Sequence, residues 1–237
     1  MPKIKKKSAK PLMQPDEEIR SMARSVTDYY HAYQKQANVV LTLLAVALIA
    51  VMAITMVRSG NERKAGLLFA AAYDAYNPGG GGTPNYPLSL QRFQDVTKQF
   101  GGTVNGAVAQ YYLGNTLVQM NQYDAALKEY EAFTKKYAGE TVLLGLVYQR
   151  MGYAYLALGR RDDALKAFGQ AEAVAGTGAA TLELARLYDR MGNSQEAQKK
   201  YKELSDKLPA TTWALEARAK LPPPDLGQTP KSGAAPK

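Results

Sequence analysis

Three copies of one residue pattern between residues 107 and 209 constrain the fold of this chain more than any other feature. Each copy has a small residue among bulky apolar ones, then a Gly or Asn turn, then an Ala-x-x-x-aromatic pair. The small residues are Gly114, Gly152 and Ala185, the turn residues are Asn121, Gly159 and Gly192, and the pairs are Ala126 with Tyr130, Ala164 with Phe168 and Ala197 with Tyr201. A small residue lets two consecutive helices approach closely, and the aromatic residues fill the space between neighbouring helix pairs. Such units bury their apolar faces only when stacked, so the pattern predicts an all-α solenoid.

This pattern resembles the tetratricopeptide repeat, a helix-turn-helix unit of about 34 residues, with Pro209 at the place of its closing proline. A weaker copy precedes the three clear ones, because Tyr86 to Gly102 matches Tyr123 to Gly139 in residue character; its first helix is expected at Arg63 to Asn77. Thr211 to Leu221, which holds the only Trp, is expected to form a solvating cap helix. The resemblance implies a tetratricopeptide-like helix-pair solenoid with about three clear units, one degenerate unit and a cap helix.

Val39 to Val57 form an uncharged apolar run. As a helix these residues span about 29 Å, close to the ~30 Å hydrocarbon core of a bilayer. A buried helix of a soluble protein would need partners on every side, and a repeat array of this size offers none. A cleaved signal peptide would have a shorter apolar region behind a short basic segment. Because 38 residues precede this run, we expect an uncleaved, single-pass transmembrane helix.

The basic residues around this run predict its orientation. Residues 1–38 carry eight Lys or Arg residues, whereas residues 58–76 carry three. The positive-inside rule therefore predicts a cytoplasmic N-terminus and a periplasmic repeat domain at a bacterial inner membrane. The basic cluster of residues 2–10 is expected to contact anionic lipid, with ribosomal RNA as the less favoured alternative.

A juxtamembrane helix is predicted between the basic cluster and the apolar run. Its apolar residues recur at helical spacing: Ile19, Met22, Val26, Tyr29 or Tyr30, and Tyr33. The apolar stripe is expected to lie along the inner membrane face, although a partner helix could occupy it instead.

The sequence therefore predicts four parts. These are a basic cytoplasmic tail with an amphipathic juxtamembrane helix (residues 1–38), a transmembrane helix (39–57), a repeat domain (58–221) with a Gly-rich insertion (77–87), and a disordered Pro-rich tail (222–237). The Gly-rich insertion lacks the preceding strand and the following Lys-Ser/Thr of a phosphate-binding loop, so we expect a flexible connection.

The composition argues against catalysis and metal binding. The chain has no Cys and only His31, so it offers no disulfide, no thiolate metal site and no catalytic triad. Asp162 and Asp163 follow the Gly159 turn, where helix capping and the helix dipole explain acidic residues. The chain has a net charge of +9, but the basic residues of the repeats do not form the stripe expected of a nucleic-acid-binding surface. We expect no enzymatic activity, cofactor, metal, nucleic acid or small-molecule substrate.

The resemblance to tetratricopeptide repeats also implies a concave protein-binding groove, lined by the second, fifth, ninth, twelfth and thirteenth positions of each first helix. These positions hold Val108, Tyr111, Asn115, Val118 and Gln119, then Leu146, Gln149, Tyr153, Leu156 and Ala157, then Ala179, Leu182, Arg186, Asp189 and Arg190. The residues predicted to bind protein are Tyr111, Asn115, Gln119, Gln149, Tyr153, Arg186 and Arg190. Tyrosines and amides suit extended polypeptide. Alternatively, some of these residues contact neighbouring units or the cap helix. The clamp that holds acidic chaperone tails is not expected, since only Asn115 matches it.

The whole layout resembles the bacterial ancillary subunit of the SecYEG translocon, with a short cytoplasmic N-terminus, one membrane helix and "GNERKAGLLFAAAYDAY" leading into the repeats. That resemblance implies an adaptor whose partners are the translocon, periplasmic chaperones or secretory clients. The repeats also look like those of the Tol-Pal-associated cell-division coordinator and of outer-membrane assembly lipoproteins, which favours an envelope scaffold. An accessory subunit of another inner-membrane complex is the third hypothesis.

Overall fold

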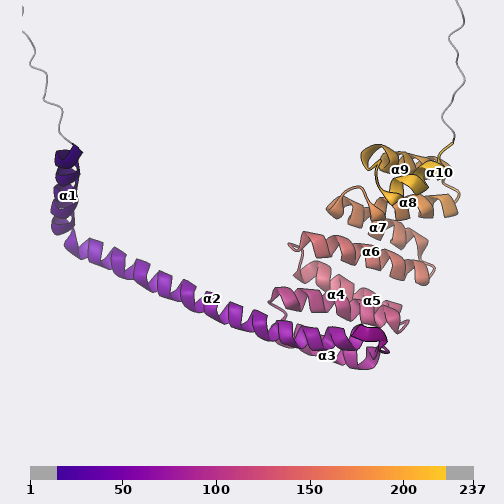
Figure 1. Ribbon diagram of the computed structural model, residues 1–237, viewed down its shortest axis with the longest axis horizontal. Helices are drawn as coiled ribbons and strands as arrows, with labels where there is room; N and C mark the ends of the chain where they lie inside the picture. Colours follow the sequence, from indigo (N-terminus) through magenta and orange to yellow (C-terminus); the bar gives the residue numbers. More distant parts are fainter. Residues whose placement is uncertain (1–14, 223–237) are drawn as a thin grey trace, which may run out of the picture. The chain divides into compact units, whose positions relative to one another are not determined.

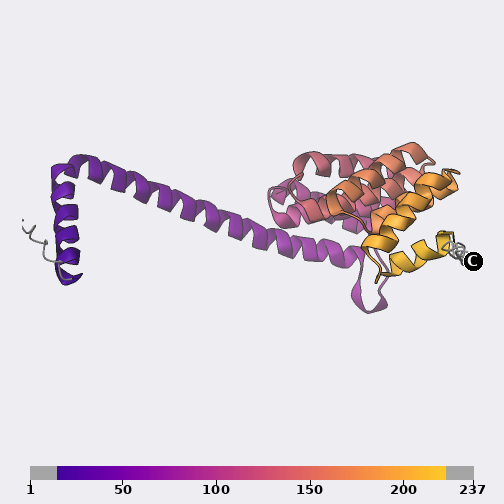
Figure 2. The same ribbon diagram turned by 90° about the horizontal axis from the view of Figure 1, so that it is seen from above.

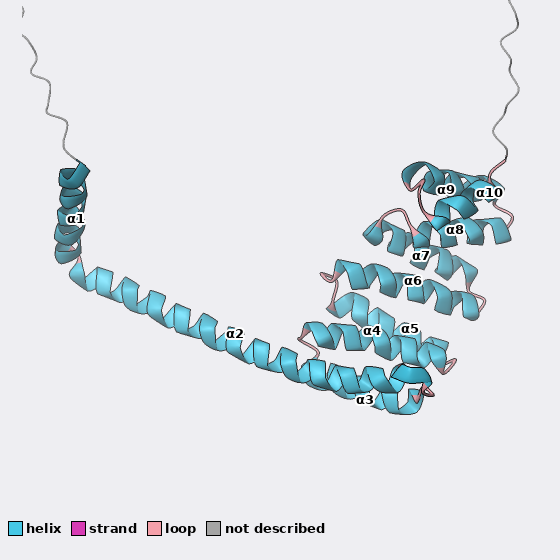
Figure 3. Ribbon diagram, viewed as in Figure 1, coloured by secondary structure: helices cyan, strands magenta, loops and turns pink. Residues whose placement is uncertain are grey.

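The computed structural model describes residues 15–222, so the predicted basic cluster and nearly all of the predicted Pro-rich tail lie outside the described residues. The chain divides into two compact units, Met1–Ser59 and Gly60–Lys237. Residues 15–222 form ten α-helices and one short 3-10 helix, and no strand occurs among them (Figure 3). The predicted all-α class is therefore confirmed.

The first unit contains α1 (Pro15–Ala32) and the beginning of α2 (Gln34–Tyr76). The apolar run of residues 39–57 forms one uninterrupted stretch of α2, and its large apolar side chains are exposed. Thr42 and Thr55 donate hydroxyl hydrogen bonds to carbonyl groups of their own helix, at 2.8 and 2.9 Å, so their polar groups are satisfied without water. By length and composition, α2 is able to cross a membrane.

In α1, Ile19, Met22, Val26 and Tyr29 are each at least 66% exposed. Their spacing places them on one face of the helix, as the sequence predicts. This face therefore has no apolar cover within the described residues of its unit.

The second unit is a stack of helix pairs. The end of α2 (residues 60–76) pairs with α3 (Tyr86–Phe100), and three further pairs and a cap follow. They are α4 (Val104–Gln119) with α5 (Tyr123–Lys136), α6 (Thr141–Ala157) with α7 (Arg161–Ala175), α8 (Ala179–Arg190) with α9 (Ser194–Lys207), and the cap α10 (Thr212–Lys220). Figure 1 shows the pairs stacked in chain order. This arrangement matches the predicted three clear units, degenerate unit and cap helix.

The small residues of the repeat pattern set the spacing within the pairs. A Cβ atom at Gly114 would lie 2.3 Å from the Tyr130 ring, and one at Gly152 would lie 2.5 Å from the Phe168 ring. Both aromatic side chains are fully buried. The two glycines therefore permit the close helix contact that the sequence pattern predicts.

The degenerate unit is held together by polar contacts as well as by its core. Ser89 on α3 donates its hydroxyl to the carbonyl of Ala72 at 3.2 Å, and Arg92 donates to the carbonyl of Ala71 at 2.8 Å. The carboxylate of Glu62 accepts the backbone N–H groups of Val104 and Asn105 at the start of α4, at 3.0 and 2.9 Å. An anionic group at a helix N-terminus satisfies free donors and interacts favourably with the helix dipole.

The Gly-rich insertion connects α2 to α3. It contains the 3-10 helix Gly79–Gly81 and projects from the stack (Figure 2). Asn85 ends the loop: its backbone N–H donates to the carbonyl of Ala75 at 2.8 Å, and its side chain accepts the N–H of Leu88 at 3.1 Å. The end of the insertion is thereby tied to both helices of the degenerate unit.

Candidate protein-binding groove

The seven predicted groove residues lie on the first helices of three consecutive pairs. Tyr111, Asn115 and Gln119 are on α4, Gln149 and Tyr153 are on α6, and Arg186 and Arg190 are on α8. They differ in accessibility. Gln119, Tyr153 and Arg190 are exposed, Gln149 and Arg186 are half-buried, and Tyr111 and Asn115 are buried. The helical repeat thus places all seven on equivalent elements, but not all of their side chains are open to a ligand.

Asn115 is used inside its own repeat. Its side-chain oxygen accepts the hydroxyl of Tyr130 on α5 at 2.6 Å, and both residues are buried. Burial raises the pKa of Tyr130, so its hydroxyl remains a donor. This hydrogen bond joins the two helices of the first clear unit.

A group of tyrosines surrounds Tyr112, the neighbour of the buried Tyr111. The ring of Tyr112 lies against Tyr73, Tyr76 and Tyr111, with centroid distances of 5.1, 5.4 and 5.2 Å. Burial and neighbouring tyrosines raise the pKa of Tyr112 to about 12. Burial also raises the pKa of Tyr76, an effect opposed by the nearby side chain of Gln119. These hydroxyl groups are therefore uncharged at neutral pH.

Arg150 on α6 extends this tyrosine group and was not among the predicted groove residues. Its Nε donates to the Tyr111 hydroxyl at 3.3 Å, which links α6 to α4. Arg150 follows Gln149 directly, at the sixth position of the repeat when Leu146 is counted as the second, and this lies outside the five positions carried over from the repeat family. The sequence does contain a signal for Arg150, because it is the one charged residue of α6 and directly follows the groove residue Gln149.

Arg186 is held by two carboxylates. One terminal nitrogen of its guanidinium contacts Glu183 at 2.6 Å, while its Nε and other terminal nitrogen contact the two oxygens of Glu216 on α10, at 2.7 and 2.6 Å. The hydrogen bond with Arg186 lowers the pKa of Glu216, and Glu216 in turn raises the pKa of Arg186. Arg186 therefore contacts the cap helix, which is the alternative to a free groove residue that the sequence analysis left open.

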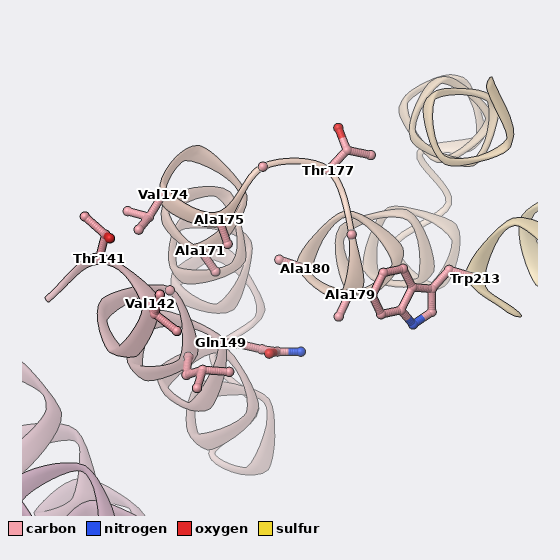
Figure 4. A pocket seen from close by; sticks show the side chains of 14 residues that line it. Thr141, Val142, Gln149, Ala171, Val174, Ala175, Thr177, Ala179, Ala180 and Trp213 are labelled. Carbon is pink, nitrogen blue, oxygen red and sulfur yellow. The ribbon is translucent and has the colours of Figure 1, made fainter. Parts of the chain in front are cut away.

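A cavity of about 490 Å³ lies between α6, α7, the start of α8 and Trp213 on α10. Figure 4 shows Gln149 projecting from α6 toward the first turn of α8, with the Trp213 ring beside that turn. Leu146, Gln149 and Ala179 belong to the positions carried over from the repeat family, whereas Val142 and Trp213 do not. Val142 is 79% exposed and Trp213 is 37% exposed, so apolar groups at the edge of the cavity face solvent.

The described residues include no group of three or more His, Cys, Asp or Glu side chains that could hold a metal ion. Asp162 and Asp163 lie in the first turn of α7, as predicted, but they do not cap it: Arg160 precedes the helix, and no side chain makes the capping hydrogen bond. The Asp163 carboxylate instead pairs with Arg160 at 2.9 Å.

Comparison with known proteins agrees with this geometry. Residues 108–139 and 179–211 match one sequence model of the tetratricopeptide repeat, and residues 146–175 match another. The fold is a tetratricopeptide-like solenoid. Each matched segment covers one of the three clear helix pairs, and no curated protein matches the chain.

Two solved structures illustrate the likeness of fold. A tetratricopeptide repeat protein from Parabacteroides merdae is 13% identical, with a TM-score of 0.55 over 67% of this chain; the match spans 59% of that protein, less than two thirds of its length. PilW, a type IV pilus biogenesis factor, is 12% identical, with a TM-score of 0.53; the match covers 65% of this chain and 67% of PilW. At such low identity these structures share the architecture, and nothing more follows from them.

Proposed function

We propose that this chain is a membrane-anchored adaptor that binds segments of other proteins along the first helices of its repeats. The observation that carries the proposal is the apolar cavity between α6 and α8, which is next to Gln149 and bordered by Trp213. Its volume falls within the range of about 300–1,000 Å³ that is usual for ligand sites. The apolar walls suit an apolar side chain of a bound polypeptide, while the amide of Gln149 can form hydrogen bonds with the backbone of that polypeptide.

The anchor in this proposal is the apolar run of α2. The excess of Lys and Arg in residues 1–38 supports a cytoplasmic N-terminus and a periplasmic repeat domain at a bacterial inner membrane. In its most specific form, the adaptor handles secretory proteins beside the translocon, together with periplasmic chaperones. The general layout supports this form, while an envelope scaffold or an accessory subunit of another inner-membrane complex is the alternative.

Capture of clients by the cavity is tested with two substitutions on α6, Leu146→Ala and Tyr153→Ala. Leu146 is 41% exposed at the cavity, and Tyr153 is 36% exposed one helical turn beyond Gln149. Because the Tyr153 ring also packs edge-on against the buried Phe168 at 5.3 Å, the double variant is first required to unfold at the normal temperature. We expect crosslinking in cells, followed by mass spectrometry, to recover fewer clients with the double variant. Leu215→Ala on α10, 63% exposed and away from the cavity, is the matched control. Equal recovery from all three proteins would remove the cavity from the mechanism.

The choice of complex is tested with a chain in which residues 38–58 are replaced by an unrelated membrane helix. Recovery of translocon subunits and periplasmic chaperones by the unaltered chain, with loss of the translocon after the exchange, would support the secretion role. Recovery of cell-wall or division proteins, or of one stoichiometric membrane complex, would instead support the scaffold or the accessory subunit.

A further inference from the structure

Arg150 has no ion-pair partner within residues 15–222, although it lies among the predicted groove residues. Its only hydrogen bond in that part of the chain joins Nε to the Tyr111 hydroxyl, and the residue is exposed to solvent. Arg186, at the other end of the predicted groove, has both sides of its guanidinium paired with carboxylates. The two arginines thus differ in what they can offer to a ligand.

The surroundings of Arg150 supply dipoles but no counter-charge. Burial lowers the pKa of Arg150, but the hydrogen bond with Tyr111 and the nearby hydroxyls of Tyr130 and Tyr76 outweigh it, so the pKa is raised. The guanidinium therefore stays charged at any physiological pH. A cation that has lost part of its hydration without gaining an anion is unfavourable, and an incoming anion removes that penalty.

The free part of the guanidinium has a defined geometry. Because the Nε–H of Arg150 donates a hydrogen bond to Tyr111, the two terminal nitrogens of the guanidinium are the hydrogen-bond donors that remain. They form a planar fork that matches the two oxygens of a carboxylate. The Tyr111 hydroxyl accepts from Arg150 and so keeps its own proton for donation. Tyr111 thereby fixes the direction of the fork.

We propose that Arg150 binds a carboxylate of the captured polypeptide, either the C-terminal α-carboxylate or an Asp or Glu side chain. This inference rests on the proposed protein-binding function and names the chemistry of the ligand. The site differs from the clamp of chaperone-binding repeats, in which only Asn115 matches and the other places are occupied here by Tyr111, Tyr153, Ala179 and Glu183. The carboxylate is instead held by one arginine oriented by a tyrosine of the neighbouring repeat.

The test uses the full chain in lipid nanodiscs and an array of decapeptides. Each peptide is made with a C-terminal acid or amide, and with Glu or Gln at one internal position. We expect carboxylate-bearing peptides to bind about tenfold more tightly than their uncharged counterparts, as one charge-assisted bidentate contact allows. A preference for acid over amide identifies the C-terminus as the ligand, and a preference for Glu over Gln identifies a side chain.

Three variants make the test specific. Arg150→Gln is expected to abolish the carboxylate preference, and Tyr111→Phe to reduce it while keeping the charge. Arg161→Gln is the matched control, because it removes the same charge from an exposed residue at the start of α7. A preference that survives in Arg150→Gln, or equal binding of charged and uncharged peptides by the unaltered chain, overturns this inference alone. If the unaltered chain binds no peptide, the proposed function fails as well.

Discussion

Gly152→Ala tests whether the small residue in each repeat is required for close contact between paired helices. An added Cβ would lie 2.5 Å from Phe168 Cε1 and 2.7 Å from Cδ1 and Cζ, all far below normal contact distance. The ring has little room to move, since Phe168 is fully buried against Ala164, Leu184 and Leu187. Either the ring or the helix spacing must therefore change.

The magnitude follows from two opposing effects. Replacing Gly by Ala inside a helix stabilises it by about 1 kcal/mol. Overpacking of a well-packed core costs about 1–3 kcal/mol, and three ring atoms closer than 3 Å place this site toward the upper end. We expect a net destabilisation of about 1–2 kcal/mol, which lowers Tm by about 2–8 °C in a chain of this size.

Thermal unfolding of the full chain in detergent, followed by helical circular dichroism, measures this effect. Gly169→Ala in α7 is the matched control, because a Cβ at that position meets nothing within 4 Å. The control should raise Tm, since only the helix-propensity gain of about 0.5–1 kcal/mol applies. Partial recovery of Tm by Phe168→Leu in the Gly152→Ala background would identify the ring as the obstacle. If Gly152→Ala is as stable as the control, close contact at this position is not required.

Two further predictions concern an ion-pair cluster and α1. Hydrogen bonds from Lys207 foremost, and also from Thr177 and Lys200, hold the pKa of Glu203 at about 2, below its ordinary value of 4.5. This carboxylate therefore stabilises the fold above pH 4.5 and loses that effect as the pH falls toward 2. Glu203→Gln should lower Tm at pH 7 but lower it much less at pH 2. An equal decrease in Tm at both pH values would contradict the reasoning. For α1, a nitroxide attached at Val26→Cys in this Cys-free chain should contact lipid in nanodiscs, whereas one at Asp28→Cys, on the opposite face, should contact water. Equal water contact at both positions would remove the membrane-surface placement of α1.

The helix pairs were predictable because their signals are local. Gly114 and Gly152 precede Tyr130 and Phe168 in the same repeats, and each glycine packs against the aromatic residue of its own unit. The turn residues Asn121 and Gly159 adopt positive φ values of 58° and 73°, a conformation that Asn and Gly tolerate better than other residues. Short-range residue patterns thus determine the unit, and stacking follows because each unit has an apolar face to bury.

The accessibility of the groove residues was not predictable in the same way, because it depends on partners distant in the sequence. Glu216 lies on the cap helix, 30 residues after Arg186, and no repeat position indicates that the two side chains meet. Arg150 and Tyr111 are 39 residues apart on successive first helices. The cavity beside Gln149 also needs Trp213, which lies outside the repeats.

The different states of Arg150 and Arg186 follow from the position of each repeat in the array. A first helix in the middle of a solenoid has another first helix on either side, and in this chain α4 presents tyrosine hydroxyls, not carboxylates, to Arg150. The last first helix, α8, instead packs beside the cap helix α10, whose polar residues make the end of the array soluble. Glu216 belongs to that polar cap and neutralises Arg186. Glu216 of the cap helix thus occupies Arg186 at the capped end, whereas Arg150, in the middle of the array, keeps its two terminal nitrogens for a ligand.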